Sequence, residues 1–146
     1  PVPDNFCCSV AHPAIMVSTR MAREVLPKDI PLRTAVKQWG NVAGLVAGLA
    51  LGDVHLVGRA MCDVVVEPYR KRFIPGFDEL REKVLAAGAL AMNISGAGPS
   101  VFTLSSDMAV AERVGEIMRE HFAEQGVGSD IYVCKVSNRG ARVLND

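Results

Sequence analysis

The chain has 146 residues with 16 basic and 16 acidic side chains, so its formal net charge is zero. This balance excludes a generic basic nucleic-acid binder and an acidic solvating tail, because both need a field of one sign. Hydrophobic residues make up 49% of the chain and charged residues 22%, which is typical of one folded globular domain. Aromatic residues are only 5%, so a stacking platform for single-stranded nucleic acid is not expected either.

The four cysteines predict neither a zinc site nor a disulfide framework. Cys7 and Cys8 are adjacent, so their side chains would point to opposite faces of a strand, and Cys62 and Cys134 complete no C-x-x-C spacing. The three histidines show no metal-ligand spacing. We therefore expect reduced core thiols in a cytoplasmic protein, with no metal site.

The start of the chain predicts no signal peptide. It begins with Pro1 where an initiator Met would stand, and no basic segment followed by an apolar stretch opens it. We therefore expect a piece of a longer protein whose N-terminal portion is missing.

The first third of the chain alternates extended segments with helices. β-Formers from Phe6 to Val17 predict two extended stretches, broken at His12-Pro13. Thr19 is a candidate N-cap for a short helix over Arg20 to Leu26, and Pro31 for the first turn of a second helix that runs to Leu51.

The second predicted helix carries glycines at strict four-residue spacing, namely Gly40, Gly44, Gly48 and Gly52. One stripe of its surface therefore lacks side chains, and a neighbouring backbone can approach closely. The apolar run from Val42 to Leu51 is too short for a membrane span, which needs roughly twenty residues. We interpret the stripe as helix packing within the domain.

The middle of the chain predicts two helices and a basic loop. Val54 to Val66 is expected to be a helix that ends near Glu67-Pro68, where Pro68 holds Glu67 extended. Tyr69 to Arg72 then form the basic loop. A helix from Asp78 to Ala87 follows, with acidic residues in its first turn.

In the last third of the chain, the spacing of apolar residues changes to that of β-strands. Ala89 to Ser95 and Val101 to Leu104 predict two strands, and Asp107 to Glu124 predicts an amphipathic helix. Ile131 to Val136 is expected to be a further strand and Ala141 to Leu144 an edge strand. This order of elements predicts an α+β fold with an antiparallel sheet packed with helices, close to a ferredoxin-like split βαβ unit.

The loop between the two paired strands is the most informative local feature. It consists of Ser95, Gly96, Ala97, Gly98, Pro99 and Ser100. Its glycines and proline bring backbone N–H groups close to one point, which favours an anion, although a plain tight turn explains the same residues. The loop is neither a dinucleotide fingerprint nor a Walker loop, because the third glycine, the following helix and the Gly-Lys-Ser/Thr are missing.

Two arginines are candidate ligand-binding residues. Thr19 and Arg23 are four residues apart, so they share one helix face and can present a hydroxyl and a guanidinium to one ligand. A guanidinium matches a carboxylate with two parallel hydrogen bonds, so Arg23 and Arg70 together suit a free amino acid or a phosphate. The residues alone leave open that both are ordinary surface arginines.

Three strings of residues, in this order, resemble the homoserine kinases of the GHMP kinase superfamily. They are TRMAREVLP at 19–27, EPYRKRFIPGF at 67–77 and ISGAGPS at 94–100. The ending GARVL at 140–144 is also similar to the C-terminus of that family. The resemblance covers essentially all 146 residues, but only the C-terminal half of a family member.

The resemblance implies that residues 1–146 are a ferredoxin-like C-terminal domain without the N-terminal domain that binds most of the ATP and Mg²⁺. Family members phosphorylate the side-chain hydroxyl of L-homoserine to O-phospho-L-homoserine in threonine biosynthesis. The resemblance also implies that Thr19, Arg23 and Arg70 bind homoserine, the two arginines through its carboxylate. It further implies that residues 95–100 line the active site. The expected partner is this small molecule, not nucleic acid or membrane, and a face left uncovered by the absent domain favours a homodimer.

The ATP-cradling loop of the family, of the type Pro-x3-Gly-Leu-Gly-Ser-Ser-Ala before a helix, does not occur in the chain. Phosphoryl transfer depends on positioning the triphosphate and neutralising its charge, so the piece alone is expected to be inactive. Two alternatives stay open. One is another GHMP kinase with a mevalonate-type or sugar acceptor, and the other is a complete, non-catalytic ferredoxin-like module that binds an amino acid.

Overall fold

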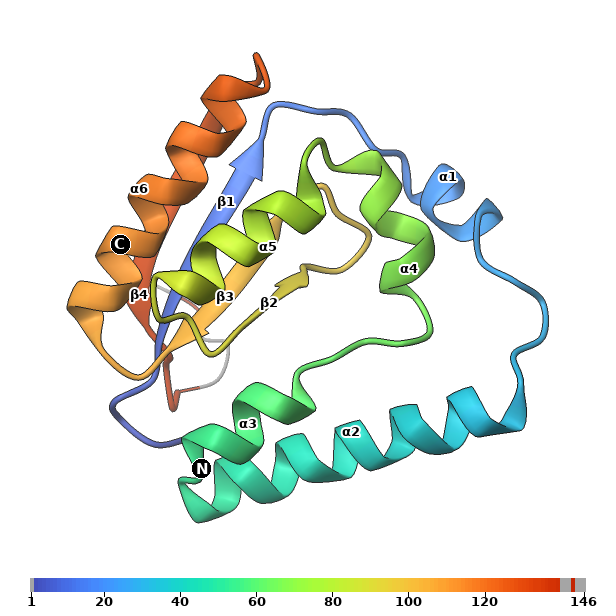
Figure 1. Ribbon diagram of the computed structural model, residues 1–146, viewed down its shortest axis with the longest axis horizontal. Helices are drawn as coiled ribbons and strands as arrows, with labels where there is room; N and C mark the ends of the chain where they lie inside the picture. Colours follow the sequence, from blue (N-terminus) through green and yellow to red (C-terminus); the bar gives the residue numbers. More distant parts are fainter. Residues whose placement is uncertain (1, 140–142, 144–146) are drawn as a thin grey trace.

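The centre of the molecule is a four-stranded antiparallel sheet in the order β2-β3-β1-β4 (Figure 1). The computed structural model describes residues 2–139 and residue 143. Its strands are β1 (Cys7–Pro13), β2 (Ala91–Ile94), β3 (Val101–Ser105) and β4 (Ser129–Lys135). Helices connect β1 to β2 and β3 to β4, which is the ferredoxin-like α+β arrangement that the sequence predicts.

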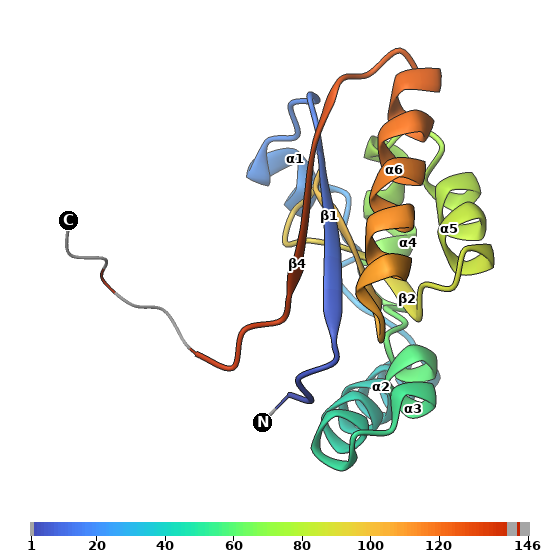
Figure 2. The same ribbon diagram turned by 90° about the vertical axis from the view of Figure 1, so that its left-hand side faces the viewer.

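Four of the six helices in the described residues lie in two pairs. The six helices are α1 (Thr19–Glu24), α2 (Leu32–Leu51), α3 (Val54–Ala60), α4 (Glu67–Arg70), α5 (Phe77–Ala86) and α6 (Met108–Glu124), with a 3₁₀ turn η1 (Lys71–Phe73) after α4. Helices α5 and α6 cover one face of the sheet, while α2 and α3 lie together below it in both views (Figures 1 and 2). Among the described residues, no helix combines the length and apolarity needed to cross a membrane.

The core lies between the sheet and the pair α5 and α6. Alternate residues of β1 and β3 are buried on this side, as expected for a sheet with one covered face. The core consists mainly of aliphatic residues and methionine, namely Ala11, Ile74, Phe77, Leu80, Val84, Ala89, Met92, Val101, Val114, Met118 and Phe122. The buried Ser9 hydroxyl donates to the carbonyl of Ala111 at 2.6 Å, which joins β1 to α6 without an unpaired polar group.

The four glycines of the predicted stripe lie in three different environments. A Cβ on Gly44 would lie 3.3 Å from the Cβ of Ala60, and one on Gly48 would lie 2.9 Å from the backbone nitrogen of Val57, so these two glycines allow α3 to pack closely. Gly52 ends α2 in the left-handed conformation at φ +70°. Gly40 has open space around it. The predicted close packing therefore holds for half of the stripe.

These glycines give a matched test of the α2–α3 contact. We expect Gly48→Ala to lower the free energy of unfolding by about 1–3 kcal/mol, because backbone atoms must move to admit the methyl group. Gly40→Ala should instead raise it by about 0.5–1 kcal/mol, because alanine costs less backbone entropy in a helix with free space. Urea denaturation of both variants measures the difference, and equal effects would contradict the packing described.

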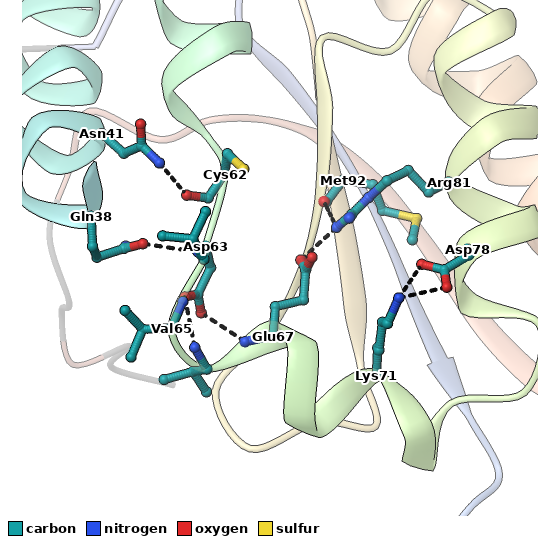
Figure 3. A network of polar contacts seen from close by, with 12 residues as sticks. Gln38, Asn41, Cys62, Asp63, Val65, Glu67, Lys71, Asp78, Arg81 and Met92 are labelled. Atoms are coloured by element: carbon teal, nitrogen blue, oxygen red, sulfur yellow. Dashed lines mark hydrogen bonds and ion pairs between the residues drawn. The ribbon is translucent and has the colours of Figure 1, made fainter. Parts of the chain in front are cut away.

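The helix predicted over Val54 to Val66 is wrong in its second half. Helix α3 ends at Ala60, and the segment that follows runs beside α2 without helical structure. The Asn41 side chain donates to the carbonyl of Cys62 at 2.6 Å, and the Gln38 side chain accepts from the N–H of Val64 at 2.9 Å (Figure 3). These side chains of α2 satisfy backbone groups that a continued helix would have used.

The predicted basic loop after Glu67-Pro68 is instead the short helix α4 followed by η1. The Asp63 carboxylate caps this turn by accepting from the N–H groups of Val65, Val66 and Glu67 at 2.9–3.2 Å (Figure 3). Pro68 occupies an early helical position, where its missing N–H costs nothing. Glu67 is therefore helical and buried rather than extended.

The break that the sequence predicts at His12-Pro13 is absent from the N-terminal strand. His12 and Pro13 do not break β1 but complete it, with Pro13 as the final residue, opposite Ser129 of β4. The edge strand predicted over Ala141 to Leu144 falls almost wholly outside the described residues, of which only Val143 belongs to it.

The prediction of core thiols is right only for Cys7, which is buried. All four cysteines are free, but Cys8 is half-buried, and Cys62 and Cys134 are exposed. Burial raises the pKa of the Cys8 thiol to about 11, with smaller contributions from Cys134 and Cys7. Cys8 therefore stays protonated at neutral pH and is a poor nucleophile.

Candidate functional site

The first candidate residues lie on α1, a helix of six residues. Ser18, not Thr19 as predicted, is its N-cap, and the Ser18 hydroxyl accepts from the N–H of Met21 at 3.1 Å. Ala22 is fully buried and anchors the helix to the domain. Thr19 and Arg23 are exposed one turn apart, so their hydroxyl and guanidinium face solvent from the same helix.

The Gly-rich loop, residues 95–100, joins β2 to β3. The N–H of Ser95 donates to the carbonyl of Ser100 at 2.8 Å, and the N–H of Gly98 donates to the carbonyl of Ser95 at 3.0 Å. Gly96 and Gly98 have φ values of +59° and +81°, which other residues adopt only with strain. Ser95 and Gly96 are exposed at the tip, Ala97, Gly98 and Ser100 are half-buried, and Pro99 is buried.

Arg70 connects these two parts of the chain. The half-buried Arg70 side chain extends from the last residue of α4. Its Nε donates to the carbonyl of Ala22 in α1 at 3.0 Å, and its Nη1 donates to the carbonyl of Gly96 at 2.8 Å. One guanidinium thus holds the backbones of α1 and the Gly-rich loop together, although they are far apart in the sequence.

The arrangement is suited to a small anion. The neighbour of Ala22 along α1 is Arg23, so the Arg70 contact brings the helix that carries Arg23 next to Arg70. A guanidinium has five N–H donors, and the two backbone carbonyls occupy two of those of Arg70. The remaining donors, together with Arg23 and the Thr19 hydroxyl, can bind a carboxylate or phosphate.

His12 is a site residue that the sequence interpretation missed. Its Nδ1 lies 2.7 Å from the Oγ of Ser100, so the imidazole at the end of β1 fixes the far end of the Gly-rich loop. Asp130 lies directly opposite His12 on β4. Nothing local to His12 indicates this contact, because it depends on the pairing of β1 with β3.

A partly buried ion pair between Glu67 and Arg81 holds the base of α4, from which Arg70 extends. The Glu67 carboxylate, 9% exposed, accepts from Nη2 of Arg81 at 2.5 Å, and the same nitrogen donates to the carbonyl of Met92 at 2.8 Å (Figure 3). The Arg81 guanidinium also lies 4.8 Å from the centre of the Phe77 ring. These contacts join α4 to α5 and β2, and so fix the direction from which Arg70 reaches the site.

A second test compares the contribution of the Glu67–Arg81 ion pair to stability with that of an exposed ion pair on α6. We expect Arg81→Met to lower the free energy of unfolding by about 3 kcal/mol, because it leaves the Glu67 carboxylate buried without its partner. Arg119→Met removes the exposed pair between Arg119 and Glu116 on α6, and should cost less than about 1 kcal/mol. Urea denaturation compares them, and losses of the same size would show that the Glu67 contact does not anchor α4.

One group of side chains has the composition of a metal site. The ligand atoms of Glu79, His121 and Glu124 lie within 4.8 Å of one another, on α5 and α6. Lys83 occupies this position, with its ammonium 2.9 Å from both carboxylates. The hydrogen bonds from Lys83 lower the pKa of Glu79, and those to Glu124 and Glu79 raise the pKa of Lys83, so the cluster holds its own cation.

The family model described as GHMP kinases C terminal matches residues 45–124, which is more than half of the chain. The chain belongs to the GHMP kinases. The matched residues of this GHMP kinase domain include Arg70 and the whole Gly-rich loop, while α1 with Thr19 and Arg23 precedes them.

Two homoserine kinases are similar to this GHMP kinase domain over nearly its whole length. The homoserine kinase of Chlorobium phaeobacteroides is 47% identical over 146 residues, which are 99% of this chain and 46% of that protein. The crystal structure of homoserine kinase from Cytophaga hutchinsonii superposes with a TM-score of 0.89 at 50% identity, over 91% of this chain and 42% of that chain. The chain therefore spans a little under half the length of the relatives it matches.

A more distant structure shares the fold alone. The phosphomevalonate kinase of Streptococcus pneumoniae superposes with a TM-score of 0.63 at 15% identity, over 92% of this chain and 41% of that chain. The fold of the domain is therefore shared with a kinase of a different name, and the fold alone does not determine the acceptor.

Proposed function

We propose that the protein carrying this chain is a homoserine kinase. It transfers the γ-phosphoryl group of ATP to the side-chain hydroxyl of L-homoserine, forms O-phospho-L-homoserine, and serves threonine biosynthesis in the cytoplasm. The observation that carries the proposal is the contact of Arg70 with both Ala22 and Gly96, which assembles α1 and the Gly-rich loop into one arginine-lined site. The names of the relatives at 47% and 50% identity support this acceptor.

The arginines favour an amino acid over a neutral acceptor. Among the described residues, the Arg23 guanidinium has no ion-pair partner, whereas Arg20 on the same helix is paired with Glu24 at 3.1 Å. A carboxylate that bridges Arg23 and the free donors of Arg70 makes charge-assisted hydrogen bonds that a sugar cannot make. The Thr19 hydroxyl supplies a further hydrogen bond, and the carboxylate contact directs the side-chain hydroxyl of homoserine away from α1.

The Gly-rich loop supplies backbone N–H groups on the other side of the site. Those of Ser95 and Gly98 donate within the loop, which leaves the N–H groups of Gly96 and Ala97 for a ligand. Donors fixed in this way stabilise negative charge that develops during transfer, because they need no rearrangement. We assign the loop to the reacting end of the substrate and Arg23 to its carboxylate end, so that catalysis here is by orientation.

ATP and Mg²⁺ do not fit the described residues of the site. The Gly-rich loop contains neither the lysine of a nucleotide-binding loop nor a carboxylate that could hold Mg²⁺. We therefore assign residues 1–146 to the C-terminal domain and the binding of most of the ATP and Mg²⁺ to a preceding domain of the whole protein. On this assignment the present chain alone does not transfer phosphate.

Steady-state kinetics of the whole protein test the arginine assignment. We expect Arg23→Ala to raise KM for L-homoserine about 10- to 100-fold, the effect of losing one or two hydrogen bonds between charged groups, and to change KM for ATP less than about 2-fold. Arg70→Ala should raise KM for homoserine and also lower kcat, because Arg70 additionally holds α1 against the loop.

Arg20→Ala is the matched control, because Arg20 is an exposed arginine on the same helix that is already paired with Glu24. Its homoserine KM should match that of the unaltered protein. Homoserine kinetics that are unchanged in both the Arg23 and the Arg70 variant would remove the assignment.

A further inference from the structure

His12 lies at the end of β1, and its side chain contacts the Gly-rich loop from outside the loop. The backbone pairing of β1 with β3 ends at Ala11 opposite Val101, so Ser100 is the next position in register with His12. There the Nδ1 of His12 and the Oγ of Ser100 lie 2.7 Å apart and share a hydrogen bond. A side-chain contact thus continues the junction of the two strands by one position into the loop.

The backbone of His12 is fixed on both sides by the sheet. Strand β1 lies between β3 and β4, and His12 itself pairs with Asp130 of β4. Among the described residues, the imidazole forms no ion pair, either with Asp130 or with another acid, so no carboxylate competes for its contact with Ser100. The contact therefore holds the end of the loop in a fixed position relative to the sheet.

Two side chains from outside the loop hold it at two points. The Nη1 of Arg70 donates to the carbonyl of Gly96 at 2.8 Å, and His12 binds the Ser100 side chain four residues further along. Arg70 also donates to the carbonyl of Ala22 in α1, whereas the Ser100 contact is the one hydrogen bond of the His12 side chain among the described residues. Loss of the His12 contact would therefore affect the loop without separating α1 from Arg70.

We propose that His12 is a positioning residue for phosphoryl transfer, which acts through Ser100 on the N–H groups of Gly96 and Ala97. The inference rests on the proposed function, because it takes the loop to lie at the reacting end of the substrate. Donors that stabilise developing charge must be aimed before the reaction, and a misplacement of about 1 Å can cost about 100-fold in rate. Loss of the contact therefore lowers kcat and leaves the binding of the homoserine carboxylate intact.

Steady-state kinetics of the whole protein test this role. We expect His12→Ala and Ser100→Ala each to lower kcat about 10-fold or more, and to change KM for L-homoserine less than about 2-fold. The double variant should have the kcat of either single variant within about 2-fold, because both substitutions remove the same contact. His12→Asn should recover most of kcat, because the asparagine amide places a hydrogen-bonding atom where Nδ1 lies. His55→Ala is the matched control, because His55 is an exposed histidine on α3, and it should leave kcat unchanged.

Hydrogen exchange of the whole protein, followed by mass spectrometry of the segment 94–101, measures the loop without any measurement of activity. The N–H groups of Ser95 and Gly98 form hydrogen bonds within the loop, so their exchange rate reports how often the loop opens. We expect His12→Ala to accelerate this exchange about 5-fold or more, the effect of losing one hydrogen bond, and His55→Ala to leave it unchanged.

Three results would overturn the positioning role while the whole protein still phosphorylates homoserine. The first is a kcat that His12→Ala and Ser100→Ala leave unchanged, and the second is a double variant in which their losses add. The third is loop exchange that His12→Ala does not accelerate. A whole protein that does not phosphorylate homoserine at all would instead contradict the proposed function, and the role of His12 in the transfer would be lost with it.

Discussion

The site depends on one side chain, because the Arg70 guanidinium holds two backbone carbonyls from different parts of the chain at 3.0 and 2.8 Å. Helix α1 is only six residues long and the Gly-rich loop is a tight turn, and Arg70 donates to a backbone carbonyl of each. Helix α4, which carries Arg70, is itself held by the Asp63 carboxylate and by the ion pair of the buried Glu67 with Arg81. The end of the domain that carries the candidate site is thus held by polar contacts, and the sheet and α5 and α6 supply the apolar support.

Sequence reasoning predicted the elements that are set by local pattern. The two strands around the Gly-rich loop, the amphipathic helix α6 and the glycine contact of α2 all follow from residues close together in the chain. The region from Met61 to Arg70 was predicted wrongly, because Gln38 and Asn41 of α2 and Arg81 of α5 decide its backbone. These partners are 14 to 26 residues away, and no periodicity within the segment reports on them.

In the candidate site, too, local pattern predicted some features, while features that depend on distant residues could not be predicted. The strings of residues were enough to name Thr19, Arg23, Arg70 and the Gly-rich loop as candidates. They could not predict that Arg70 binds two backbone carbonyls and keeps further donors for a ligand. His12 was missed because its contact with Ser100 depends on strand register. The same fold occurs in kinases of different names, so the fold by itself does not identify the substrate.

The central claim is that Arg23 and Arg70 recognise the acceptor by its carboxylate. The most direct measurement compares kcat/KM of the whole protein for L-homoserine and for 3-aminopropan-1-ol, which keeps the amine and the hydroxyl but lacks the carboxylate. The account predicts a preference for homoserine of at least about 1,000-fold, and a preference at least about 10-fold smaller in the Arg23→Ala variant. Similar kcat/KM values for the two acceptors, or a preference that Arg23→Ala leaves unchanged, would contradict it.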